Sequence, residues 1–203
     1  MKRIFLIAAL ALALPMAVFA NSGVDFTNSG GMLMGSSAGL SLTGSTLIAV
    51  NGFGGGGLVT GNDLGSLSFS TGSLLSGSLQ TGGSFNGGGS FVITGNGTGG
   101  IPNGMIFTGT FHGPVSWAMI TLANGTHNYT LTGDIQGTWL NGSGSVYGAT
   151  VQLTINTGKG FFNGMTNISS GDTNIVVPEP GSLSLLGTGL IGLAGVIRRK
   201  LKG

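Results

Sequence analysis

The sequence predicts an all-β fold, an antiparallel sandwich of the jelly-roll type or a barrel, between an N-terminal signal helix and a C-terminal transmembrane helix. Apolar and polar residues alternate through the middle of the chain, which is typical of strands that bury one face. Asn-Gly pairs, which favour tight hairpin turns, recur between these stretches. They begin at Asn51, Asn86, Asn96, Asn103, Asn124, Asn141 and Asn163.

The first 20 residues have the three-part composition of a secretory signal peptide. Lys2 and Arg3 form a basic start, residues 4–14 are apolar, and small residues lead to Ala20. We expect signal peptidase to cut after Ala20. The predicted organisation is therefore a signal peptide at 1–20 and an exported β-rich domain at 21–177.

Strands are expected where the alternation is clear and turn residues flank it. In residues 150–156, Val151, Leu153 and Ile155 share one face. Residues 21–63 are less regular, and 54–57 are expected to form a loop. The expected strands lie near residues 45–50, 65–70, 73–79, 89–94, 104–112, 115–122, 127–133, 135–140, 146–156 and 160–166.

A weak Gly-Ser-Leu/Phe repeat leaves a β-solenoid as a third architecture. Its copies begin at Gly65, Gly72, Gly77, Gly83 and Gly89. A solenoid predicts a constant period, and this spacing drifts. The drift favours ordinary strands and turns.

The charge of the exported part differs from that of the whole chain. The formal net charge is +2, but six of the seven basic residues lie in the terminal segments. Between the two basic clusters, from Arg3 to Arg198, one lysine, Lys159, against five acids gives −4, which excludes a basic surface for nucleic acid. Such a low charge suits neutral polymers such as glycans. The acids are Asp25, Asp63, Asp134, Asp172 and Glu179.

The sequence predicts no catalytic, cofactor-binding or metal-binding residue. Residues 35–39 match the text of the GxSxG nucleophile elbow but lack its strand-to-helix context. His112 and His127 have no metal-ligand spacing and are interpreted as surface histidines. Asp63 is interpreted as a turn residue.

Aromatic and asparagine residues leave two further interpretations open. The aromatic residues either stack on sugars or fill the core, and core packing is favoured; they are Trp117, Trp139, Tyr129 and Tyr147. Asn-x-Ser/Thr triplets are interpreted first as turns, because glycosylation depends on the host. They begin at Asn96, Asn124, Asn128, Asn141 and Asn167.

The last residues form a rigid segment, an apolar run and a basic end. Pro178, Glu179 and Pro180 stay extended because proline disfavours helix. Residues 181–197 carry no charge and as a helix would be roughly 26 Å long, near the short limit for a bilayer core of about 30 Å. The basic end at 198–203 is expected to stop transfer on the cytoplasmic side. Its basic residues are Arg198, Arg199, Lys200 and Lys202.

The residues 177–203, with the sorting signal itself assigned to 178–203, resemble the PEP-CTERM sorting signal of exported bacterial proteins. The resemblance implies an exosortase-type membrane enzyme that removes the tail near 178–180, in a Gram-negative host that makes extracellular polysaccharide. It also implies a precursor anchored in the inner membrane and a product at the cell surface or in the matrix. The alternative is a C-terminal anchor that is never cut.

Two classes of function remain. The first is a non-enzymatic surface or matrix protein that associates with exopolysaccharide or biofilm. The second is a secreted carbohydrate-binding or carbohydrate-active β-sandwich protein with the same sorting signal. A glycosidase needs two carboxylates in a defined arrangement, and the scarcity of acids favours the first class. The expected partners are signal peptidase, the exosortase-type enzyme and extracellular polysaccharide.

Overall fold

The computed structural model describes residues 23–139 and 144–176. Within these ranges the chain forms one 14-stranded sheet and a short 3-10 turn, η1 (Phe53–Gly55). The unit Gly23–Val177 is compact. The prediction of an all-β fold is confirmed for this part of the chain.

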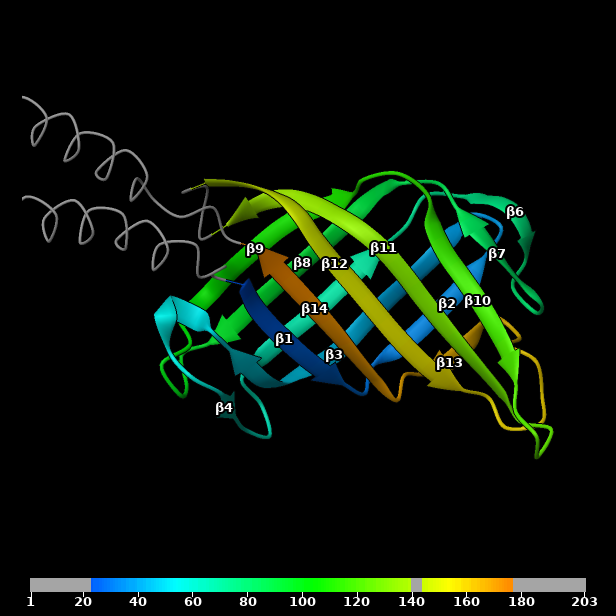
Figure 1. Ribbon diagram of the computed structural model, residues 1–203, viewed down its shortest axis with the longest axis horizontal. Helices are drawn as coiled ribbons and strands as arrows, with labels where there is room; N and C mark the ends of the chain where they lie inside the picture. The colour runs from blue at the N-terminus through cyan, green and yellow to red at the C-terminus, as the bar shows by residue number, and fades with distance from the viewer. Residues whose placement is uncertain (1–22, 140–143, 177–203) are drawn as a thin grey trace, which may run out of the picture. The chain divides into compact units, whose positions relative to one another are not determined.

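Eight of the strands close into an antiparallel barrel, which decides between the predicted architectures (Figure 1). The ring closes because β12 pairs with β14 on one side and with β11 on the other. All its pairings are antiparallel, unlike those of a parallel β-helix. In ring order the strands are β12 (Gly144–Asn156), β14 (Ser170–Val176), β1 (Gly23–Ser29), β3 (Gly39–Asn51), β5 (Gly65–Ser70), β8 (Gly88–Asn96), β9 (Asn103–Phe111) and β11 (His127–Trp139).

The remaining strands branch from the ring. The first half of β11 pairs with β10, and the sheet continues from β10 to β7 and β6. β2 pairs with β3 and β13, and β4 pairs with β3. These strands are β2 (Met32–Ser36), β4 (Val59–Thr60), β6 (Leu74–Ser78), β7 (Gly82–Phe85), β10 (Val115–Thr121) and β13 (Met165–Asn167).

The core lies inside the barrel and is built from the apolar positions of the alternating strands. Val151, Leu153 and Ile155 are all buried, as the alternation predicts. Phe91 is fully buried and packs against Phe107, with ring centroids 6.1 Å apart, and against Phe111 at 6.0 Å. An eight-stranded barrel has an interior just wide enough for side chains to fill.

The Gly-Ser-Leu/Phe copies mark strands and turns of the antiparallel sheet, as the drift in their spacing predicts. Gly65 begins β5 and has a φ of 146°, and Gly89 lies in β8 with a φ of 67°. A β-carbon at Gly65 would overlap the carbonyl oxygen of Thr94 on β8. Glycine is therefore needed where these two strands approach each other.

Several predicted boundaries were wrong. Residues 127–133 and 135–140 were expected as two strands, but 127–139 form the single strand β11, whose register with β12 shifts after Ile135. Of the strand expected at 160–166, only the last two residues are in a strand, as the beginning of β13. In the segment 21–63, where only 45–50 was expected as a strand, that prediction falls within β3, and the segment also holds β1, β2 and β4.

Regular alternation along β9 would place Met105 on the inner face with Phe107, but Met105 is 43% exposed. The cause is a bulge in β9. Ile93 lies opposite Phe107 and Thr94 lies opposite Met105, which leaves Ile106 as the extra residue. A bulge reverses the alternation of side chains beyond it, so Ile106 and Phe107 are both buried.

The terminal predictions concern residues beyond these ranges. The signal peptide at 1–20 and the transmembrane helix at 181–197 both lie outside the described residues. Along 23–139 and 144–176, no helix has the length and apolar character needed to cross a membrane.

The aromatic packing around Phe91 makes a stability prediction. Phe91→Ala should lower the free energy of unfolding by about 3–5 kcal/mol, because it leaves a cavity among Phe69, Phe107 and Phe111. Leu75→Ala on β6 is the control, since Leu75 is 54% exposed. Urea unfolding of both variants measures the difference, and equal losses would contradict the packing described here.

Candidate functional site

The residues predicted for sorting and processing lie outside the described part of the chain. They comprise the signal-peptidase site Ala20, the motif Pro178, Glu179 and Pro180, and the basic residues Arg198, Arg199, Lys200 and Lys202. The described residues form the barrel. Buried apolar side chains fill its interior, which leaves the outer surface as the place for a site.

Trp117 and Tyr129, considered for sugar stacking, lie inside the barrel. Their rings stack with centroids 5.0 Å apart. Trp117 Nε1 donates a hydrogen bond of 2.9 Å to the Leu79 carbonyl. The Tyr129 hydroxyl donates to the Gln80 carbonyl at 2.7 Å and accepts from the Phe162 backbone N–H at 3.0 Å. The two rings thus fix the β6–β7 turn and the segment around Phe162.

Trp139 also belongs to the core. It is 8% exposed, and its ring lies 6.1 Å from that of Phe26 and 5.6 Å from that of Phe53. The core interpretation is therefore confirmed for Trp117, Tyr129 and Trp139. The side chain of Tyr147 lies outside the described residues.

His127 is not a surface histidine, which corrects the sequence interpretation. It is 8% exposed, its backbone N–H donates to the Gly158 carbonyl at 2.7 Å, and its Nδ1 lies 3.0 Å from Thr121 Oγ1. Its ring stacks on Phe161 with centroids 4.5 Å apart. Phe161 itself is 53% exposed, so it is an aromatic surface that the sequence analysis missed.

The two histidines do not meet. His112 is exposed, directly after β9, and its backbone N–H donates to the Asp134 carbonyl at 2.8 Å. Asp134 lies seven residues beyond His127 on β11, which corresponds to about 23 Å along a strand. Among the residues that the structure describes, no group of three His, Cys, Asp or Glu side chains could hold a metal ion.

The outer surface of β11, β12, β14 and β1 carries two neighbouring rows of polar side chains, which we call the polar face. Strand register places the members of each row opposite one another. All are exposed or half-buried, and they carry hydroxyl, amide or carboxylate groups. The rows are Asp134, Thr150, Asn174 and Asp25, and Thr132, Gln152, Asp172 and Thr27.

Two carboxylates come together on the polar face. Asp25 lies opposite Asn174, whose Nδ2 donates a hydrogen bond to its carboxylate. Asp172 is two residues from Asn174, so Asp25 and Asp172 are diagonal neighbours, about 7–8 Å apart. This pair was not predicted from the sequence, because neither β1 nor β14 was expected as a strand.

Asp63 and the GxSxG text have the structural roles expected of them. Asp63 Oδ1 accepts from the Gly65 N–H at 3.1 Å, and its carbonyl accepts from Asn96 Nδ2 at 2.7 Å, as in a turn. The GxSxG text spans the β2–β3 hairpin: Ser36 ends β2 and Gly39 begins β3. That connection joins two strands, whereas a nucleophile elbow joins a strand to a helix.

The Asn-x-Ser/Thr positions differ from one another. Asn96 and Asn124 accept hydrogen bonds from the backbone two residues on, at 3.1 and 3.0 Å, which confirms the turn interpretation. Asn128 was expected in a turn but lies in β11 and accepts from Asn156 Nδ2 at 2.5 Å. Asn167 ends β13, and Asn141 lies outside the described residues.

Comparison with known proteins identifies the C-terminal segment. A family model described as the PEP-CTERM protein-sorting motif matches residues 176–200. The resemblance inferred from residues 177–203 is therefore confirmed, and the motif marks the chain as an exported protein of the kind that an exosortase processes. No curated protein and no solved structure matches the chain.

The contacts of Tyr129 predict the effect of removing its hydroxyl. Tyr129→Phe should lower the free energy of unfolding by about 1–3 kcal/mol, because the buried Phe162 N–H loses its acceptor. Thermal or urea unfolding measures this loss. The neighbouring Thr130→Val, on the outer face, is the control and should change stability by less than about 0.5 kcal/mol. A Tyr129→Phe variant as stable as the parent would show that the hydroxyl does not fix these segments.

Proposed function

We propose that this chain is a non-enzymatic surface or extracellular-matrix protein of a Gram-negative bacterium, delivered by exosortase-type processing to exopolysaccharide or biofilm. The observation that carries the proposal is the sorting motif at residues 176–200. In this scheme signal peptidase cuts after Ala20. The segment 181–197 anchors a precursor in the inner membrane until the enzyme cuts near 178–180.

The strand pairing supports this processing scheme. The first residue of β1, Gly23, lies opposite the last residue of β14, Val176 (Figure 1). The proposed cuts fall just outside these two residues, after Ala20 and near Pro178. Both cuts would therefore leave every ring strand with its partners, so the delivered barrel keeps its fold.

The polar face supports contact with polysaccharide. Its hydroxyl and amide groups can exchange hydrogen bonds with a hydroxyl-rich polymer, and its only charges are those of Asp25, Asp134 and Asp172. Elsewhere on the surface, the exposed ring of Phe161 offers an apolar surface of the kind on which sugars stack. The chemistry of this surface fits a neutral glycan better than an anionic polymer, which those carboxylates would repel.

Asp25 and Asp172 support a second candidate, a carbohydrate-active enzyme. As diagonal neighbours their α-carbons are about 7–8 Å apart, a spacing from which two carboxyl groups can reach the separation of about 6.5–9.5 Å found in inverting glycosidases. However, both residues are exposed on the outer surface of the barrel. A glycosidase keeps its general acid in an apolar environment, so we favour the non-enzymatic function.

Processing predicts two chain lengths in the host. In cells with the exosortase-type enzyme, intact mass should show a chain that begins near Asn21 and lacks 181–203. In cells without the enzyme, the tail should remain. Asp172→Asn, a change on the barrel strand β14 and outside the sorting motif, is the control and should be processed normally. A mature chain that keeps 181–203 in the presence of the enzyme would instead identify a permanent anchor.

Polysaccharide contact predicts a binding difference between two sides of the barrel. The double variant Thr150→Val and Gln152→Leu should bind the host's extracellular polysaccharide on the order of tenfold more weakly, because each lost hydrogen bond contributes about 0.5–1.5 kcal/mol. Thr94→Val on β8, opposite β14 in the ring, is the matched control. Co-sedimentation measures the affinity.

The same samples test the enzymatic alternative. Release of reducing ends from the polysaccharide, lost in Asp25→Asn or Asp172→Asn, would overturn the non-enzymatic proposal. A parent chain that does not sediment with the polysaccharide would overturn the proposed contact while leaving the sorting scheme intact.

A further inference from the structure

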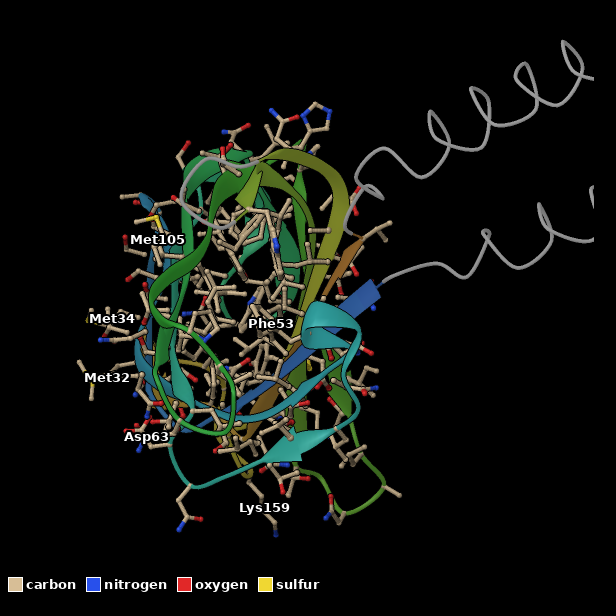
Figure 2. All side chains as sticks on the ribbon, turned by 90° about the vertical axis from the view of Figure 1, so that its left-hand side faces the viewer. Met32, Met34, Phe53, Asp63, Met105 and Lys159 are labelled. Carbon is tan, nitrogen blue, oxygen red and sulfur yellow. The ribbon has the colours of Figure 1, made fainter. Side chains whose placement is uncertain are left out.

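Three methionines are exposed together on the strand pair β2–β13, beside the ring. Met32, Met34 and Met165 are 41%, 40% and 56% exposed, whereas Leu33, between the first two, is fully buried. Figure 2 shows Met32 and Met34 pointing outward on the same side of the barrel. The register places Met165 directly opposite Met34. All three side chains therefore belong to one outer surface, which we call the methionine cluster.

The spacing of the cluster allows its sulfur atoms to converge. Directly opposite residues have β-carbons about 4.5–5.5 Å apart, and diagonal neighbours such as Met32 and Met165 are about 7–8 Å apart. Methionine is unbranched and has three rotatable bonds, so three thioethers can reach one point above the strands. On the other side of β2, the residues opposite Met32 and Met34 are the short, neutral Thr43 and Ser41.

The other two methionines of the described residues have different surroundings. Met119 is half-buried, and its sulfur accepts a hydrogen bond from Thr121 Oγ1 at 3.5 Å. Met105 is exposed on β9, which is separated from β2 by β8, β5 and β3. The cluster is thus the one place, within residues 23–139 and 144–176, where the fold gathers several thioethers.

The chemistry of the cluster indicates a class of ligand. Thioethers are soft donors that select Cu(I)-like ions, whereas hard cations prefer carboxylate and carbonyl oxygens. Neither β2 nor β13 contains an Asp or Glu that would favour a hard cation. The chain also contains no cysteine, so no thiolate competes with the thioethers for a soft ion.

We propose that Met32, Met34 and Met165 bind one soft monovalent cation of the Cu(I) class through their thioether sulfurs. Asn167, opposite Met32 in the register, is placed to add an oxygen ligand. The site needs no other part of the barrel surface and is independent of the polysaccharide contact. An exported barrel would then carry a soft-metal site on its outside.

Silver(I) is a suitable probe because it has the same softness and does not change oxidation state in the assay. Calorimetric titration of the full-length chain with silver(I) should show one bound ion per chain. Met34→Leu and Met165→Leu should each weaken silver binding by about tenfold or more. Loss of a residue that only supports a metal ligand already lowers metal affinity by about tenfold, and these residues are proposed as ligands themselves. Leucine keeps the apolar volume, so this change tests the sulfur itself. Met105→Leu is the matched control and should bind as the parent does.

A second measurement keeps the test decisive if a leucine variant fails to fold. In the parent chain, silver should shift the methyl NMR signals of Met32, Met34 and Met165 and leave those of Met105 and Met119 in place. Failure of the parent to bind silver, or binding that persists in the triple leucine variant, would overturn the proposal. The parent chain and the triple leucine variant could both form a dimer without silver, and neither could bind the metal. That result would instead assign the cluster to apolar contact between two copies of the chain.

Discussion

The pairing of β1 with β14 is the interaction on which the barrel depends. It joins the two ends of the described chain, and β14 then pairs with β12 to complete the ring. Without it, β1 and β14 would each expose an unpaired edge, which invites association with other chains. The chain contains no cysteine. Hydrogen bonds and apolar burial must therefore provide the stability that disulfides give to many small exported domains. Closure links residues distant in sequence, and such contacts form slowly in folding.

Ring closure also separates the apolar side chains that face the interior from the polar side chains that face outward. Apolar residues fill the interior, and Trp117 and Tyr129 fix connecting segments from within. Recognition is consequently left to the outer surface, where short neutral side chains predominate. Both proposed outer sites follow from strand pairing: the polar face from the register of four ring strands, and the methionine cluster from that of β2 with β13.

The sequence predicted the strands whose inner positions are uniformly apolar, such as β5 and β12. It missed β1 and β14 because their inward positions include Asn28 and Thr173, which interrupt the apolar alternation. Asn28 Nδ2 donates to Ser45 Oγ at 2.7 Å, a partner that only the folded register provides. Among the described side chains, Asn28 Oδ1 and Thr173 Oγ1 are buried without a hydrogen-bond partner.

The site was less predictable than the fold. The sorting motif was found because its order of residues is itself the signal, independent of tertiary structure. The residues of the Asp25–Asp172 pair and of the Met34–Met165 pair are more than a hundred positions apart in the sequence. No local sequence pattern indicates that they are neighbours in the fold. The bulge in β9, which turns Met105 outward, illustrates the same limit: one extra residue, Ile106, reverses the orientation of the side chains before it relative to those after it.

The positions of the barrel ends fit the proposed removal of the tail. Gly23 and Val176 form the last pair of the β1–β14 ladder, and the sorting match begins at residue 176. No residue of the motif beyond this pair contributes to a described strand. Loss of the residues beyond this pair would therefore leave the described β1–β14 and β12–β14 ladders complete. The strand pairing that closes the barrel lies wholly within residues 23–176, so the proposed cut near 178–180 falls outside every described strand.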